Sequence, residues 1–175
     1  MDYLAQGTPD SKRIHREPTA FALGDTEFKL LEIAPKENVT FAIGDRVYIG
    51  KDPVKREKVM HVKRRISWGD LTTAAQNEVP YVLETIIRQT ELRFVKFFNE
   101  AEPVSTRFHT LELIPGLGKK TMLAIVGERK KKPFASLDDL AARVSSVHSP
   151  SKLIGKRIEL ELSDPQEKYR LFVAR

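Results

Sequence analysis

The sequence predicts an α+β fold in which a small β-barrel or sheet comes first, helices follow, and a β-hairpin ends the chain. Three observations indicate this order. Short β-type runs punctuated by Gly and Pro occupy residues 19–68, apolar residues at helical intervals follow, and strict alternation returns near the end. The 175 residues suffice for one domain or two small ones, and a 41% hydrophobic content supplies a core. We therefore divide the chain into residues 1–69, 70–148 and 149–175.

The first region contains four or five runs with the composition of strands: TAFALG, EFKLLEI, VTFAIG, DRVYIG and EKVMHVKRRISW. An irregular lead-in, residues 1–17, precedes them. Because so few short strands bury little surface as an open sheet, we expect a small barrel. In the last run Met60, Val62 and Ile66 alternate with basic residues, which predicts one apolar and one basic face. With the preceding loop KDPVKREK, the basic face gives a second candidate contact, which comprises Lys55, Arg56, Lys63 and Arg65. A merely solvated surface is the alternative interpretation.

The region after Asp70 predicts helices with apolar core faces. Pro80 is tolerated only in the first turn of a helix, so we expect a short helix, a break, and one or two longer helices. The phenylalanines of LRFVKFFNEA recur at intervals of one and three, and we interpret them as core rather than as a base-stacking platform. A second helical pair is expected from about Ser105 to Val144.

The tail IGKRIELELSDPQEKYRLFVAR returns to a period of two. Ile158, Leu160 and Leu162 alternate with charged residues, and Asp164-Pro165 marks a turn. This pattern predicts a C-terminal β-hairpin. An isolated hairpin is marginal in water, so it should dock on the N-terminal sheet or on the helices.

Composition excludes several classes of protein. The chain has no cysteine, which rules out disulfides, thiolate metal sites and cysteine nucleophiles. No apolar run reaches the roughly 18 residues of a membrane span, and the N-terminus lacks the apolar core of a signal peptide, so the cytosol is the expected compartment. A net charge of +6 favours a polyanionic partner.

The stretch LELIPGLGKKTMLAIV contains a tight turn between two apolar-periodic segments. Pro115 stops the first segment, Gly116 and Gly118 permit the close backbone geometry of a turn, and the second helix should start at about Lys119. The first amides of a helix have no intrahelical partner and attract anions. We therefore expect the amides of Leu117 to Lys120 to accept a phosphodiester, with charge added by two lysines.

Two narrower phosphate motifs are excluded by spacing. A Walker loop ending at Gly118-Lys119 would need glycine at Leu113 and a hydroxyl residue at Lys120. A dinucleotide fingerprint would need glycine or alanine at Thr121 and a preceding strand.

Basic residues concentrate around this turn. Between residues 105 and 148 there are eight Lys and Arg against four Asp and Glu, a surplus of four that makes up most of the net charge. Cations also stabilise the C-terminal end of any helix, so interaction with the helix dipole accounts for about half of the reason for these basic residues. The segment ERKKK extends the candidate contact and consists of Arg129, Lys130, Lys131 and Lys132. Ser136 is the predicted N-cap of the next helix, with Asp139 at its third position.

The stretch LELIPGLGKKTMLAIVGERKKKPFASLDDLAARV resembles a helix-hairpin-helix motif, in which Gly-x-Gly amides hold a backbone phosphate whatever the sequence of the nucleic acid. With the regions before and after it, LRFVKFFNEAEPVSTRFHTLELIPGLGKK resembles an archaeal family of unassigned function over nearly the whole chain. That family is predicted to bind RNA and is thought to pair an OB-like β domain with a helix-hairpin-helix domain. The resemblance implies this architecture, a hairpin at about residues 105–128, and RNA rather than DNA as partner. The residues that match the phosphate-contacting turn are Gly116, Leu117, Gly118, Lys119 and Lys120.

The expected function is therefore sequence-independent, non-catalytic nucleic-acid binding, with no cofactor except the monovalent cation that such hairpins can hold on backbone carbonyls. Two alternatives remain. Asp138 lies twenty residues past the last hairpin glycine, where related DNA glycosylases have a catalytic Asp, although Asp138 and Asp139 are also explained as helix-start residues. Alternatively, the chain is a protein-protein adaptor. The four histidines and the carboxylates form no metal-binding motif.

Overall fold

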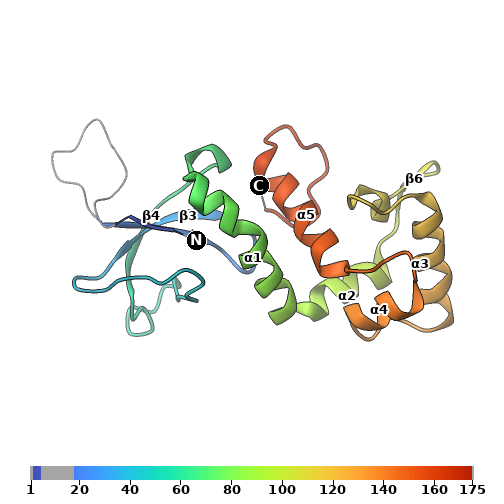
Figure 1. The fold of residues 1–175 in the computed structure, drawn as a ribbon, viewed down its shortest axis with the longest axis horizontal. Coiled ribbons are helices and arrows are strands. Elements are labelled where there is room, and N and C mark those ends of the chain that lie inside the picture. The colour runs from blue at the N-terminus through green and yellow to red at the C-terminus, as the bar shows by residue number, and fades with distance from the viewer. Residues whose placement is uncertain (1, 5–17, 175) are drawn as a thin grey trace. The chain divides into compact units, whose positions relative to one another are not determined.

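The computed structural model describes residues 2–4 and 18–174 of the chain, with side chains from Pro18 onward. The chain forms two compact units, shown in Figure 1. Unit 1 comprises Met1–Val82 and Phe172–Arg175, and unit 2 comprises Leu83–Leu171. Most of the lead-in expected at residues 1–17 lies outside the described residues.

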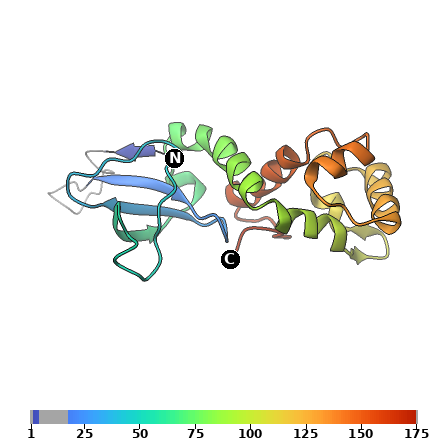
Figure 2. The same ribbon diagram turned by 90° about the horizontal axis from the view of Figure 1, so that it is seen from below.

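Unit 1 contains an antiparallel sheet in the order β1-β2-β3-β4 (Figure 2). Its strands are β1 (Asp2–Leu4), β2 (Thr19–Leu23), β3 (Leu30–Pro35) and β4 (Val59–Arg65). The buried residues Ala20, Ile33 and Val59 form a core cluster on this sheet. Strands were therefore predicted correctly at TAFALG, EFKLLEI and EKVMHVKRRISW.

The strands predicted at VTFAIG and DRVYIG are wrong, and no closed barrel is found in the described part of the chain. Residues 36–58 form an irregular segment with local backbone bonds and positive φ angles at Asn38 and Gly44. Phe41, Val47 and Ile49 pack against the core cluster from this segment. Their apolar side chains thus cover the sheet without adding a strand to it.

The alternation predicted for β4 is broken by two irregularities in its pairing with β3. Ile33 pairs with Val62 and Pro35 with Val59, so the register skips Lys63 and Met60. Because a bulge inserts one unpaired residue, it shifts the faces to which the following side chains point. Met60 is consequently 48% exposed rather than in the core.

A short 3-10 helix, η1 (Trp68–Asp70), leads into the long helix α1 (Thr73–Gln89), which passes from unit 1 into unit 2. Pro80 lies inside α1, so the predicted break is wrong. Proline removes one helical hydrogen bond, and its ring here is exposed, where water can satisfy the freed carbonyl. Val79 and Leu83 of the same helix are fully buried.

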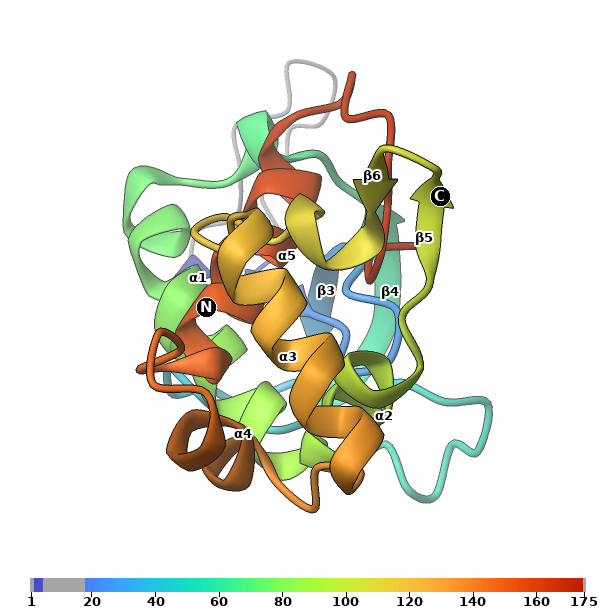
Figure 3. The same ribbon diagram turned by 90° about the vertical axis from the view of Figure 1, so that its right-hand side faces the viewer.

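Unit 2 consists of α2 (Glu91–Glu100), a β-hairpin of β5 (Pro103–Ser105) and β6 (Phe108–His109), the 3-10 helix η2 (Thr110–Leu113), α3 (Lys119–Lys131), α4 (Leu137–Arg143) and α5 (Pro150–Ser163). Figure 3 shows α3 in front, with β6 near its upper end. The prediction that the phenylalanines are core is confirmed for Phe94 and Phe98, which are fully buried, while Phe97 is half-buried with its ring edge against Phe98.

The predicted C-terminal β-hairpin is wrong, because residues 150–163 form α5. Pro150 occupies the first turn, where it costs nothing. Ile154 and Ile158 are buried four residues apart, so the alternation seen in the sequence is incidental. After α5 the chain is irregular and returns to unit 1, where the Ala174 amide donates to the Glu27 carbonyl at 3.1 Å. Among the described helices, none combines the length and apolar content required to span a membrane.

Candidate nucleic-acid interface

The glycine turn joins η2 to α3. The Leu117 amide donates to the Ile114 carbonyl at 3.0 Å, and Gly116 takes a φ of +90°, which favours glycine. Gly118 is the N-cap of α3, and the Met122 amide donates to its carbonyl at 2.9 Å. The second helix therefore begins at Lys119, as predicted. The first arm is shorter than expected, because the β5–β6 hairpin occupies the residues from 103 to 109.

Four consecutive amides at the start of α3, those of Gly118, Lys119, Lys120 and Thr121, have no hydrogen-bond acceptor within residues 2–4 and 18–174. This set is shifted by one residue from the predicted one, since the Leu117 amide closes the turn and its side chain is buried. Gly118 is exposed, and a Cβ built there meets nothing within 4 Å. The space beside Gly118, at the start of this set of donors, is therefore open to an approaching anion.

The two lysines that follow the turn are exposed. Neither the Lys119 nor the Lys120 ammonium has an ion-pair partner among the described side chains. The turn thus combines backbone donors, the positive end of the α3 dipole and two uncompensated charges.

Buried side chains of the turn itself and side chains of α5 fix the geometry of the turn. Ile114 and Leu117 are buried, and a Cβ on Gly116 would lie 3.4 Å from Cδ2 of Leu153 on α5. The Arg157 guanidinium, also on α5, donates through Nη1 to the Leu113 carbonyl at 3.1 Å. These contacts hold the turn against the core of unit 2.

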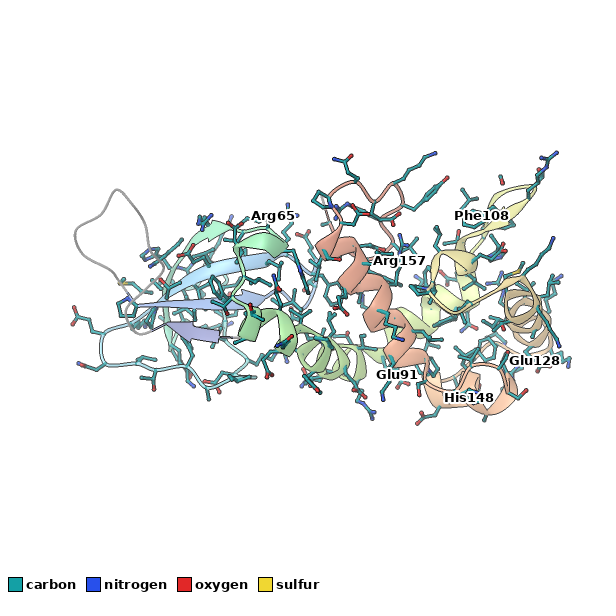
Figure 4. The ribbon with its side chains drawn as sticks, turned by 45° about the horizontal axis from the view of Figure 1, so that its top comes forward. Arg65, Glu91, Phe108, Glu128, His148 and Arg157 are labelled. Atoms are coloured by element: carbon teal, nitrogen blue, oxygen red, sulfur yellow. The ribbon has the colours of Figure 1, made fainter. Side chains whose placement is uncertain are left out.

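Arg157, labelled on α5 in Figure 4, forms a buried ion pair with Glu161 of the same helix. The Arg157 Nε and the Glu161 Oε1 are 2.8 Å apart. Arg157 also donates to the Tyr169 carbonyl, while Glu161 accepts the Leu171 amide at 2.8 Å. The sequence did not reveal this network, because the apparent alternation assigned both residues to the polar face of a predicted strand. The i,i+4 spacing of Arg and Glu was the signal available for it.

His109 is the N-cap of η2. Its Nδ1 accepts the Leu111 amide at 3.1 Å, and the Glu112 carboxylate accepts the His109 amide at 2.8 Å. Burial, with the nearby positive charge of Arg129, lowers the pKa of His109 from its ordinary value of 6.5. The neutral imidazole therefore stabilises the first arm of the turn.

The predicted ERKKK contact divides into structural and free cations. Arg129 donates to the carbonyls of Phe98 and Ala101, both at 2.8 Å, and so caps the end of α2; burial lowers its pKa. Lys131 pairs with Glu128 at 2.5 Å. Lys130 and Lys132 are exposed and have no ion-pair partner in the described part of the chain.

The second candidate contact lies in unit 1, and all four of its cations bind groups of that unit. Lys63 donates to the Thr19 hydroxyl at 2.7 Å, and Arg65 donates to the Ala174 carbonyl at 2.9 Å. The other two interactions, each within the 36–58 segment, are Arg56 with the Gly50 carbonyl at 2.6 Å and Lys55 with Asp52 at 3.9 Å.

Asp138 is an exposed residue in the first turn of α4. The cap predicted at Ser136 is confirmed, because its hydroxyl accepts the Asp139 amide at 2.9 Å. The Asp139 carboxylate in turn accepts the Ala135 amide at 3.0 Å. Across the described residues, no three His, Asp or Glu side chains are placed to share a metal ion.

These features define an α+β protein in which an open antiparallel sheet is joined to a mostly helical unit with a glycine turn at a helix start. The chain belongs to the DUF655 family, described as a protein of unknown function, which matches residues 1–174.

Two relatives support this assignment. The chain is 46% identical over 174 residues to the uncharacterized protein MJ0038 of Methanocaldococcus jannaschii, covering 99% of this chain and 77% of that protein. It is also similar to the crystal structure of Af1531 from Archaeoglobus fulgidus, with 48% identity and a TM-score of 0.90 over 99% of this chain and 96% of the other. Both relatives are archaeal, and neither name states a function.

Proposed function

We propose that this protein binds nucleic acid through its sugar-phosphate backbone, without reading base sequence and without catalysing a reaction. The observation that carries this proposal is the set of four unpaired amides from Gly118 to Thr121, with open space at Gly118 and two unpaired lysines in the same turn. Backbone donors at a helix start bind a phosphate oxygen equally well whatever the base attached to it.

The likeness of the turn to a helix-hairpin-helix motif favours a nucleic acid over other polyanions. The preference for RNA over DNA rests on the family resemblance alone. In this proposal Lys130 and Lys132 extend the contact to the far end of α3. The eleven residues from Lys120 to Lys130 span about 16 Å of helix. The second candidate contact contributes less to binding in this proposal, because each of its cations already binds a group of unit 1: Lys55, Arg56, Lys63 and Arg65.

The substitution Gly118→Asp tests the turn directly. Asp is a favourable N-cap, and the empty space at Gly118 accepts a side chain, so α3 should keep or gain stability. The carboxylate would occupy the helix-start amides and repel phosphate. We expect the Kd for a fluorescein-labelled oligonucleotide, measured by anisotropy in 50 mM salt, to rise at least tenfold, equivalent to about 1.4 kcal/mol.

Gly69→Asp is the matched control, since it makes the same change in charge at an exposed glycine whose Cβ position is also empty. It should leave the Kd within about twofold of the original. For the unchanged protein, log K should fall linearly with log salt concentration, by about 0.7 for each phosphate contacted on a single strand. Equal weakening by both aspartates, or binding that ignores salt, would contradict the proposal.

A further inference from the structure

We propose that unit 2 takes single-stranded nucleic acid and stacks one unpaired base on the aromatic pair Phe108–Tyr169 beside the glycine turn. This inference rests on the proposed function, because it requires a phosphate at the start of α3. It adds a second type of contact, to a base rather than to the backbone, and so specifies the strandedness of the ligand.

The pair consists of Phe108 on β6 and Tyr169 in the segment after α5. Their ring centroids are 6.2 Å apart and their planes are inclined by 43°. Both rings are half-buried, whereas Phe94 and Phe98 of the same unit are completely enclosed. The pair therefore keeps ring surface in contact with solvent, which the core phenylalanines lack.

A basic residue adjoins each member of the pair in the sequence. The Lys168 ammonium lies 5.2 Å from the centroid of the Tyr169 ring. Arg107 is exposed at the tip of the β5–β6 hairpin, and its guanidinium has no partner among the described residues. The neighbouring Glu167 accepts the Tyr169 amide at 3.0 Å and lies 3.3 Å from Arg157, so its charge is compensated. Aromatic surface beside unpaired cations matches a nucleotide, which has a flat base and an anionic phosphate.

One guanidinium connects the pair to the turn. Arg157 donates through Nη1 to the Leu113 carbonyl, at the entry to the turn, and through Nη2 to the Tyr169 carbonyl. Figure 4 shows Arg157 on α5 and Phe108 on the β-hairpin. Because Arg157 is buried and paired with Glu161, both ends of this connection are fixed. The aromatic pair and the helix-start amides are therefore presented together, so that one strand can contact both.

Strandedness follows from the chemistry of the bases. In a duplex the bases are stacked and paired, so their faces are closed to a protein side chain. In a single strand a base can turn out and stack on an aromatic ring, and such a contact changes the affinity by roughly 5- to 150-fold. Backbone amides and lysines, in contrast, bind the phosphates of either form.

The test compares Kd values for three labelled ligands: a 12-nucleotide RNA, DNA of the same sequence, and the corresponding DNA duplex. Phe108→Leu and Tyr169→Leu should each weaken binding of both single strands by roughly 5- to 150-fold and leave duplex binding unchanged. Phe97→Leu, the same change at a half-buried aromatic of α2, should alter none of the three. A loss confined to RNA would assign the effect to the 2′-hydroxyl and overturn stacking.

A change in the ligand checks the result without relying on the folding of a variant. Abasic residues throughout the single strand should weaken binding to the unchanged protein by the same factor, and should have no further effect on Tyr169→Leu. Equal losses for single strand and duplex, or no loss from abasic residues, would overturn the stacking proposal while leaving the phosphate contact intact. If the unchanged protein binds neither form, or Gly118→Asp leaves both Kd values unaltered, the proposed function itself fails.

Discussion

Several arginines in unit 2 bind carbonyl oxygens of the chain rather than facing solvent. Arg129 holds the end of α2 and Arg157 holds the glycine turn. Arg143 donates to the carbonyls of Glu128 and Lys132 at the end of α3, with its guanidinium 4.6 Å from the ring centroid of Phe134. A charge surplus counted from the sequence therefore overstates the charge offered to a ligand. The lysines supply more of the unpaired charge.

His109 gives this unit a predicted dependence of stability on pH. The pKa of His109 is lowered in the folded protein, so the unfolded chain binds the proton more strongly. Stability is fully present above the unfolded value of about 6.5 and is lost as the pH falls through the folded pKa. We expect the denaturation midpoint of unit 2 to decrease between pH 7.5 and 5.

His109→Asn should remove this part of the pH dependence, because its amide oxygen accepts the same backbone hydrogen bond and does not titrate. The carboxylates with lowered pKa values, such as Asp139 and Glu128, lose their contribution at lower pH, since their ordinary values are 3.8 and 4.5. If the denaturation midpoint falls by the same amount from pH 7.5 to 5 in His109→Asn and in the unchanged protein, His109 is excluded as the cause.

The individual helices show how local signals succeed and fail. At α3 the glycine turn and the predicted helix start at about Lys119 both agree with the structure, and the free amides differ from the predicted set by one residue. At α5 the charged and apolar residues alternate over a few positions as a strand would, although Pro150 already indicated a helix start. The helical assignment prevails because it buries Ile154 and Ile158 on one side and pairs Arg157 with Glu161. No single residue in the tail determines that this segment is a helix.

Two glycines near α3 should respond in opposite ways to the same substitution. Gly127 lies inside α3 with open space around its Cβ position, so Gly127→Ala should stabilise the protein by about 0.5–1 kcal/mol. Gly116 has a φ of +90°, where alanine is strained, and Gly116→Ala should cost about 1–2 kcal/mol. Chemical denaturation measures both, and a stabilising Gly116→Ala would contradict the geometry of the turn.

At the scale of the whole molecule, the chain leaves unit 1 within α1 and returns to it after Leu171. The returning segment is fixed by the Ala174 amide and carbonyl, which bond to Glu27 and Arg65, and by the burial of Val173 at 4% exposure. Both ends of unit 2 are thus continuous with unit 1. The last residues complete the packing of a unit whose strands come from the start of the sequence.

Val173→Asp should accordingly destabilise unit 1 by about 2–4 kcal/mol, because it buries a charge without a partner. Hydrogen exchange resolved by peptide measures this, with faster exchange expected in β2 and β3. Val54→Asp makes the same change at a residue that is 86% exposed, and should alter stability by less than about 0.5 kcal/mol. Similar exchange in both variants would show that the tail contributes little to unit 1.

The sequence by itself determined the α+β composition, three strands of the sheet, the phenylalanine core and the start of α3. Each of these depends on short-range properties: residue periodicity, backbone freedom at glycine, and capping. Tertiary structure alone decided that residues 36–58 cover the sheet as an irregular segment, that the tail is a helix, and that Arg129 and Arg157 bind carbonyls. Those outcomes depend on partners distant in the chain, whose burial and hydrogen bonding outweigh local preference.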